Sequence, residues 1–178
     1  MTCRSCGSSN LAPFIDLGSA PLSNGYLTEQ ELQSPEVWLP LKVNVCTECW
    51  LAQTEDYLSS SEIFTPDYAY FSSSSRSWLL HAERFVKEVL DRFNLDSNST
   101  VIEVAANDGY LLQFVQARGI RALGIEPTAS TASVARSLGL TIVEDFLQET
   151  TGSEIAARYG QADLVVANNV LAHVPDVN

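Results

Sequence analysis

Basic residues are scarce in this 178-residue chain, and long apolar runs are missing. Ten lysines and arginines stand against 22 aspartates and glutamates, which gives a net charge of −12 and a pI near 4.4. A chain this acidic repels a phosphate backbone and shows no basic patch, so we expect no nucleic-acid partner. No stretch approaches the roughly 20 apolar residues of a membrane helix, and the N-terminus lacks the apolar core of a signal peptide. We therefore expect no membrane partner and a cytoplasmic location.

Glycine is also scarce where a dinucleotide site would need it. Residues 101–109 read VIEVAANDG, a β-branched apolar run that breaks at Asn-Asp-Gly, and helical periodicity begins directly afterwards. This pattern is typical of a strand, a ligand-binding turn and a helix. A G-x-G-x-x-G loop brings its backbone against a pyrophosphate, whereas this turn has only Gly109, with Ala105 and Ala106 ahead of it. The sequence favours a nucleoside over a dinucleotide.

Strand and helix patterns alternate from Val101 onward. Apolar runs predict strands at 101–104, 122–125, 140–143 and 162–168, and helical patterns separate them at 110–117, 129–138 and 151–159. This alternation predicts an α/β fold with a parallel sheet and right-handed crossovers. A parallel sheet that ends at its fourth strand has an unpaired edge, which is unusual, so we expect a truncated chain or a gene fragment.

The four cysteines form two C-x-x-C pairs, Cys3 with Cys6 and Cys46 with Cys49. In a reducing compartment such pairs bind metal more often than they form disulfides. Each pair can direct both sulfurs at one ion, and four thiolates complete a tetrahedral zinc site without an open position, which indicates a structural role. The gap between the pairs exceeds the common spacing of about 15 to 20 residues, so folded structure must fill it. A redox C-x-x-C and four unrelated thiols are the alternatives.

These patterns divide the chain into three parts. We expect a small zinc-binding module at 1–55, with bound metal supplying the stability that so short a segment lacks. A linker and a long helix follow at 56–99. An incomplete Rossmann-like domain occupies 100–178.

The linker is rich in aromatic residues and serine, and it ends in TPDYAYFSSSS. Ser74 or Ser75 is placed to cap the long helix, whose apolar residues recur at helical spacing on one face. Tyr68, Tyr70 and Phe71 have two interpretations. They either pack this helix onto the sheet or close over a bound cofactor.

Ligands of open α/β sheets bind at the carboxyl ends of the strands. Glu103 and Asp108 offer acceptors there, which suit a cationic ligand, and Glu126 follows the second strand at a position typical of a carboxylate that binds a ribose diol. S-adenosylmethionine has both features, and its adenine could lie beside Phe146. Alternatively Glu103 is a buried structural acceptor, Asp108 a turn residue and Glu126 a solvated charge. The candidate cofactor residues are Tyr70, Phe71, Glu103, Ala105, Asn107, Asp108, Gly109, Glu126, Pro127, Asp145, Phe146, Asn168 and Asn169.

The chain has two histidines. His81 falls in the predicted long helix, where we expect a surface or packing role. His173 follows the fourth strand at the ligand end of the sheet, where we expect it to shape the pocket rather than transfer a proton, because position alone does not establish reach to a substrate.

Several segments together resemble the zinc-binding sugar C-methyltransferases: CRSCGS, PLSNGYL, the second C-x-x-C pair, DYAYFSSSSRSWLLHA, VIEVAANDGYLL, LGIEP and NNVLAHVPD. The resemblance covers the whole chain. It implies a class I methyltransferase fold, zinc on the four cysteines, and S-adenosylmethionine bound by the Asn107-Asp108-Gly109 turn, Glu126 and the Asn168-Asn169 region.

The same resemblance implies a reaction. Enzymes of this family methylate carbon 3 of nucleotide-linked 4-keto deoxysugars: a base removes a proton next to the ketone, and the enolate carbon attacks the methyl group. They are much longer, so the resemblance also implies catalytic residues beyond Asn178 and an inactive chain on its own. The alternative is a zinc-stabilised, non-catalytic binding or scaffold module. The missing glycines argue against an NAD-dependent enzyme.

Overall fold

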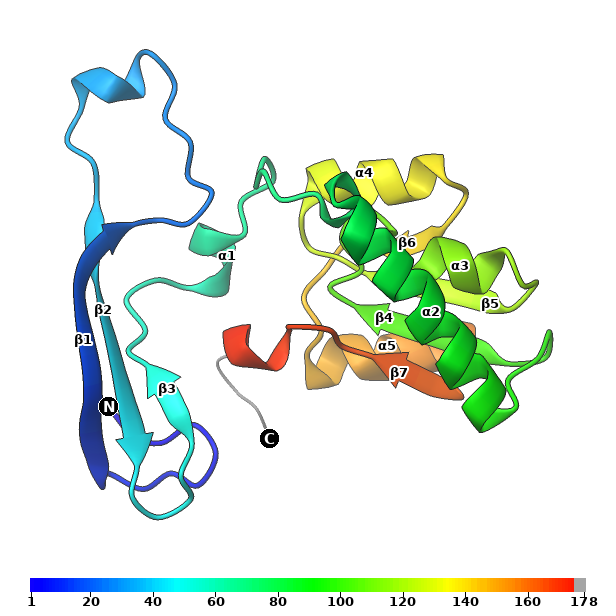
Figure 1. The fold of residues 1–178 in the computed structure, drawn as a ribbon, viewed down its shortest axis with the longest axis horizontal. Helices are drawn as coiled ribbons and strands as arrows, with labels where there is room; N and C mark the ends of the chain where they lie inside the picture. The colour runs from blue at the N-terminus through cyan, green and yellow to red at the C-terminus, as the bar shows by residue number, and fades with distance from the viewer. Residues whose placement is uncertain (175–178) are drawn as a thin grey trace. The chain divides into compact units, whose positions relative to one another are not determined.

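The computed structural model describes residues 1–174 of the chain (Figure 1). It separates into two compact units, one containing Met1–Thr65 with residues 171–174 and the other containing Pro66–Val170. The predicted linker and long helix at 56–99 are therefore shared between the units. The physical reason is that the long helix packs on the sheet of the second unit, whereas residues 56–65 pack with the first.

A long antiparallel hairpin forms most of the first unit. The sheet order is β1-β2-β3, and the strands are β1 (Leu11–Pro21), β2 (Trp38–Cys46) and β3 (Ala52–Thr54). The pairing of β1 with β2 shifts register between Asp16 and Ser19, where Gly18 has a φ of +80° and donates its N–H to Asp16 Oδ1 at 2.9 Å. A short helical turn, η1 (Glu31–Gln33), lies between β1 and β2, and another, α1 (Ser60–Ile63), follows β3.

The second unit contains the predicted parallel sheet, which is confirmed. Its order is β6-β5-β4-β7, with every pair parallel. The strands are β4 (Thr100–Val104), β5 (Arg121–Ile125), β6 (Thr141–Val143) and β7 (Leu164–Val166). The helices are α2 (Arg76–Phe93), α3 (Leu112–Gln116), α4 (Ala129–Ser137) and α5 (Glu149–Tyr159), with a 3-10 turn at η2 (Ser72–Ser74). The 3-10 turn η3 (Leu171–His173) belongs to the first unit.

Two of these elements are shorter than their patterns predict. The predicted helix at 110–117 begins only at Leu112, because the residues before it belong to the turn after β4, where the Gly109 N–H donates to Ala106 O at 3.0 Å. The predicted strand at 162–168 pairs with β4 over three residues only, so β7 is a short strand.

Apolar side chains form two clusters around this sheet. Alternation along β4 places Val101 and Glu103 on one face and Ile102 and Val104 on the other. The first face packs against α2 and α3, and the second packs against α5 through Ile155. Glu103 therefore lies on the face that α2 and α3 cover.

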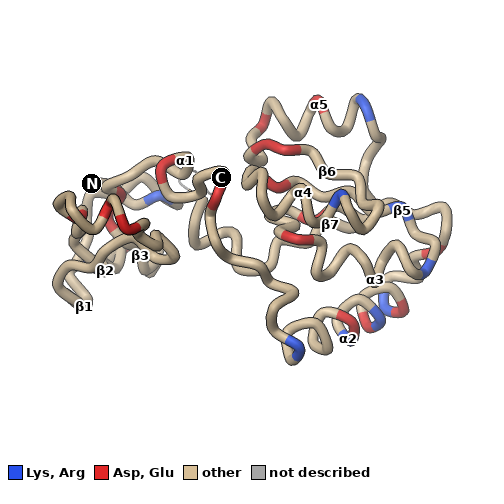
Figure 2. The backbone as a smooth tube through the Cα atoms, turned by 90° about the horizontal axis from the view of Figure 1, so that it is seen from above, with Lys and Arg blue, Asp and Glu red and all other residues tan. Residues whose placement is uncertain are grey.

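The long helix α2 begins as predicted. The Ser75 side chain accepts a hydrogen bond from the Trp78 N–H at 3.3 Å, which confirms a serine cap. Ala82, Val86 and Leu90 are buried at four-residue spacing. Basic and acidic residues are mixed along α2, so the helix has no run of basic residues alone (Figure 2). Among the described residues, no helix is both long and apolar enough to cross a membrane.

Candidate functional site

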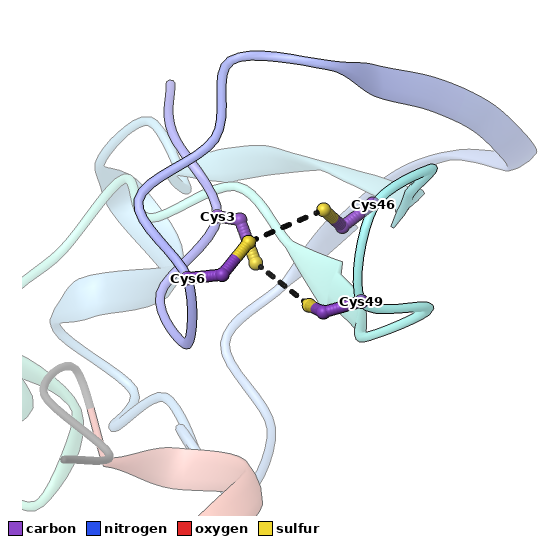
Figure 3. Close-up of side chains that lie close together, drawn as sticks. All are labelled: Cys3, Cys6, Cys46 and Cys49. Carbon is purple, nitrogen blue, oxygen red and sulfur yellow. Dashed lines mark hydrogen bonds between the residues drawn. The ribbon is translucent and has the colours of Figure 1, made fainter.

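The four cysteines predicted to bind zinc come together in the first unit (Figure 3). Their Sγ atoms all lie within 4.8 Å of one another, with 3.4 Å between Cys3 and Cys49 and 3.7 Å between Cys6 and Cys46. Disulfide sulfurs lie about 2.05 Å apart, and all four thiols are free. Zinc–sulfur bonds of about 2.3 Å in a tetrahedron separate the sulfurs by about 3.8 Å. The donor set therefore fits a zinc ion and not two disulfides.

Strand β3 fixes the first cysteine pair in place. The side chain of Gln53 is 5% exposed; its Oε1 accepts the Arg4 N–H at 3.0 Å, and its Nε2 donates to Thr2 O at 3.0 Å. A hydrogen bond from the Cys6 backbone lowers the pKa of Cys3 to about 6, whereas desolvation and neighbouring sulfurs raise the pKa of Cys6 and of Cys49. Cys3 is therefore the thiol that most readily forms the thiolate that a metal ion requires.

In the second unit, the turn between β4 and α3 has an unusual backbone. Ala105, Asn107 and Gly109 have φ angles of +54°, +51° and +80°. For alanine this left-handed conformation costs about 1 kcal/mol or more. Such strain concentrates at ligand sites, where the surrounding structure enforces it. The turn lies at the carboxyl end of β4, as predicted for the cofactor site.

Three predicted carboxylates around this turn are buried: Glu103, Asp108 and Glu126 are 0%, 1% and 4% exposed. Neither carboxylate oxygen of Glu103 has a hydrogen-bond partner among the described residues. Burial raises the pKa of Glu103 well above its ordinary value; the neighbouring Tyr110 hydroxyl opposes this shift, while the charges of Glu126 and Asp108 add to it. No ion pair in the described part of the chain involves any of the three. A buried carboxyl group without a partner is most stable in its neutral form, and a cation close by would favour the charged form.

Glu126 connects the β4 turn to the helix that follows β5. Its Oε2 accepts the Asn107 N–H at 2.8 Å, and its Oε1 accepts the Thr128 N–H at 2.9 Å. The second bond places the carboxylate at the N-terminus of α4, where a negative charge is favourable. Each oxygen retains a lone pair, so Glu126 can also accept a hydrogen bond from a ligand hydroxyl.

The side chains of Asn107 and Asp108 contact the segment that precedes α2. Asp108 accepts the Ser73 N–H at 3.0 Å through Oδ2. Asn107 Oδ1 accepts the Ser72 N–H at 2.8 Å, and its Nδ2 donates to Tyr70 O at 2.9 Å. The structure therefore brings the predicted linker residues and the predicted cofactor turn together.

Tyr110 is a site residue that the sequence analysis missed. It is 4% exposed, its hydroxyl accepts a hydrogen bond from Asn168 Nδ2 at 3.3 Å, and its ring stacks on Trp78 at 5.9 Å. Burial and the nearby Glu103 raise the pKa of Tyr110. Its position directly after Gly109 was the only sequence signal, because it reads as the first apolar residue of a helix.

Other predicted residues make local contacts. Asp145 is exposed and accepts the Phe146 N–H at 2.7 Å, Pro127 is half-buried, and Asn169 is exposed with a φ of +56°. His173 belongs to the first unit, where its ring lies edge-on to Phe64 at 6.0 Å. The other histidine, His81, is exposed and stacks on Trp78 at 5.0 Å.

A separate hollow of about 350 Å³ lies beside α5 and is lined by Ile102, Ile125, Ile155 and Val165, among others. Ile102 is on the face of β4 opposite Glu103. The residues around this hollow include no charged side chain. The hollow therefore offers no carboxylate to a cationic ligand.

Both parts of the chain match families of known proteins. A zinc binding domain family matches residues 3–64, and a methyltransferase domain family matches residues 78–178. The chain therefore belongs to the methyltransferase family, with a zinc-binding module ahead of the methyltransferase domain, which confirms the predicted fold class. It is 30% identical to the C-methyltransferase NovU of Streptomyces niveus over 176 residues, which are 99% of this chain and 42% of that protein. The chain spans about two fifths of this relative's length.

Proposed function

We propose that this chain binds S-adenosylmethionine at the carboxyl ends of β4 and β5. The observation that carries the proposal is Glu103, a fully buried carboxylate without a hydrogen-bond partner among the described residues. A buried carboxylate needs a cation to be stable in its charged form. S-adenosylmethionine provides a sulfonium and an ammonium group, and its ribose diol offers donors for Glu126. The methyltransferase family match supports the same ligand.

We further propose that the chain is part of an enzyme that methylates carbon. The name of the relative from Streptomyces niveus supports this reaction, and the sequence resemblance supports a nucleotide-linked keto-deoxysugar as the substrate. Bound S-adenosylmethionine supplies an electrophilic methyl group. Glu103 and Glu126 would hold this ligand, and it would supply its methyl group to the carbon next to the ketone once a base had removed a proton from that carbon.

Within this reaction, the described residues have a binding role. Glu103 stabilises the positive charge of the cofactor. Glu126 orients the ribose, and its hydrogen bonds also hold the Asn107 backbone and the start of α4 in place. The Tyr110 hydroxyl accepts a hydrogen bond from Asn168, which connects the turn after β4 with the end of β7. Because Glu103 lies on the face covered by α2 and α3, water is excluded from its carboxylate.

Calorimetric titration of the zinc-loaded chain with S-adenosylmethionine, and separately with NAD, tests the proposal. We expect saturable binding of the first ligand and none of the second, because the turn lacks the glycines of a pyrophosphate site. Binding of NAD alone would overturn the proposal. Binding of neither ligand by a cooperatively unfolding, zinc-containing chain would favour the non-catalytic scaffold.

A further inference from the structure

A strap of ten residues, 66–75, crosses the proposed cofactor site. At its start, the carbonyl of Pro66 accepts the Ser130 N–H, in the first turn of α4, at 3.1 Å. At its end, Ser75 caps α2. Since α4 follows β5 and the middle of the strap contacts the turn after β4, the strap runs across the carboxyl ends of these two strands.

The side chain of Asn107 makes the first attachment of the middle of the strap. Asn107 accepts the Ser72 N–H through Oδ1 and donates to the Tyr70 carbonyl through Nδ2 at 2.8 and 2.9 Å. A primary amide can make both bonds at once, whereas a carboxylate has no donor. Asp108 adds a second attachment, from the next amide of the strap, Ser73.

The backbone of Asn107 is ordered independently of the strap. Its N–H donates to Glu126 Oε2 at 2.8 Å, and its φ of +51° lies in the left-handed region. Asparagine tolerates this region better than most residues. The amide that attaches the strap is therefore placed by the same carboxylate that we assign to the ribose.

We propose that Asn107 is a positioning residue that fastens the strap across the bound cofactor and slows its release, and this inference rests on the proposed function. Tyr70 is 51% exposed and Phe71 is half-buried, so their rings remain available to cover a ligand. Of the two interpretations of this aromatic segment, the proposal favours the one in which the rings close over a bound cofactor, and not the one in which they only pack the helix onto the sheet. Asn107 acts on the ligand through the strap and not by direct contact.

Replacement of Asn107 by glycine tests the attachment, because glycine adopts a positive φ freely and removes only the side-chain bonds. Loss of two ordinary hydrogen bonds should raise the opening equilibrium of the strap roughly 30-fold. We expect the Ser72 amide to exchange with deuterium faster by about that factor, and the dissociation rate of S-adenosylmethionine in stopped-flow measurements to rise about tenfold or more.

Asn94→Gly is the matched control. Asn94 also has a left-handed backbone, with a φ of +52°, but it ends α2 and does not contact the strap. Its replacement carries the same backbone entropy change, and it should leave both the Ser72 exchange and the ligand dissociation rate unchanged.

A second variant removes the other side of the same bond. Ser72→Pro deletes the N–H that Asn107 accepts, at the first position of η2, where proline is tolerated. Its effect on the dissociation rate should resemble that of Asn107→Gly, and the double variant should be less than additive because both changes remove one interaction.

Unchanged Ser72 exchange in Asn107→Gly would overturn the attachment. Faster exchange with an unchanged ligand dissociation rate, or additive effects in the double variant, would overturn the positioning role. If the wild-type chain fails to bind S-adenosylmethionine, the proposed function fails and the cofactor role of the strap fails with it. The exchange experiment alone then decides whether Asn107 fastens the strap.

Discussion

Replacement of Glu103 by glutamine should abolish the pH dependence of cofactor binding. In the free protein, burial without a hydrogen-bond partner raises the pKa of Glu103, so at mildly acidic pH the side chain is protonated and neutral. A cationic ligand binds the ionised carboxylate, so binding must release the proton. Glutamine has nearly the same shape but carries neither the charge nor the proton.

The size of the effect follows from proton linkage. Below the pKa of Glu103 in the free protein, the affinity for S-adenosylmethionine should rise about tenfold per pH unit, or about 1.4 kcal/mol. Above that pKa the affinity should become constant. In Glu103→Gln the profile should be flat at or below the lowest wild-type affinity, since no carboxylate forms at any pH.

The same shift predicts a change in folding stability. The pKa of Glu103 is higher in the folded protein than its ordinary value of 4.5, so the folded state binds the proton more tightly. The stability contribution of this proton is complete below about pH 4.5 and is lost as the pH rises through the folded-state pKa. Urea unfolding should show that decline in the wild type and a smaller one in Glu103→Gln.

The assay is calorimetric titration with S-adenosylmethionine between about pH 5 and 7, below the range where the ligand's own amine titrates. Repeating it in two buffers of different ionisation enthalpy measures proton release directly. Glu88→Gln, on the exposed face of α2, is the charge-matched control and should behave as the wild type. A wild-type affinity independent of pH, or proton release that persists in Glu103→Gln, would refute the assignment of Glu103.

Three other changes test the two sites. Cys46→Ser should release zinc and lower the unfolding temperature of the first unit, as measured by metal analysis and calorimetry, because metal binding and folding are coupled. Glu126→Ala should weaken S-adenosylmethionine binding in the same titration by about 1 to 3 kcal/mol, the scale of a hydrogen bond to a charged group. Gly109→Ala should reduce stability to urea by about 1 to 3 kcal/mol, since its Cβ would lie 2.4 Å from Leu140 Cδ1 at a φ of +80°.

A control variant or a contradicting result tests each of these three substitutions. A Cys46→Ser chain that keeps one equivalent of metal and its melting curve would show that the four-cysteine assignment is wrong. Glu154→Ala, exposed on α5, controls for the loss of one charge in the Glu126 experiment, and equal affinities of the two variants would remove Glu126 from the site. Gly119 has a φ of +73° with open space around it, so Gly119→Ala separates backbone strain from the predicted clash at Gly109.

Structure can be predicted from the sequence where a short segment contains its own geometry. Two residues between cysteines are enough to direct both sulfurs at one point, and the apolar run into Asn-Asp-Gly is enough to place a strand and a turn. Helix ends were less accurate: Tyr110 fits a helical period, yet it belongs to the turn and contacts Asn168. A helical pattern of apolar residues cannot show that the preceding turn includes its first apolar residue.

The sequence by itself determined the zinc-binding module, the parallel α/β domain and the set of carboxylates at its strand ends, because spacing and periodicity are local properties. The tertiary structure decided how those carboxylates differ. Glu126 accepts two backbone amides and Asp108 accepts one from a residue 35 positions earlier, whereas Glu103 accepts none from the described residues. The bond from Ser73 to Asp108 depends on how the strap passes the turn, and the bond from Asn107 to Glu126 depends on the pairing of β4 with β5. Neither is a local property of the chain.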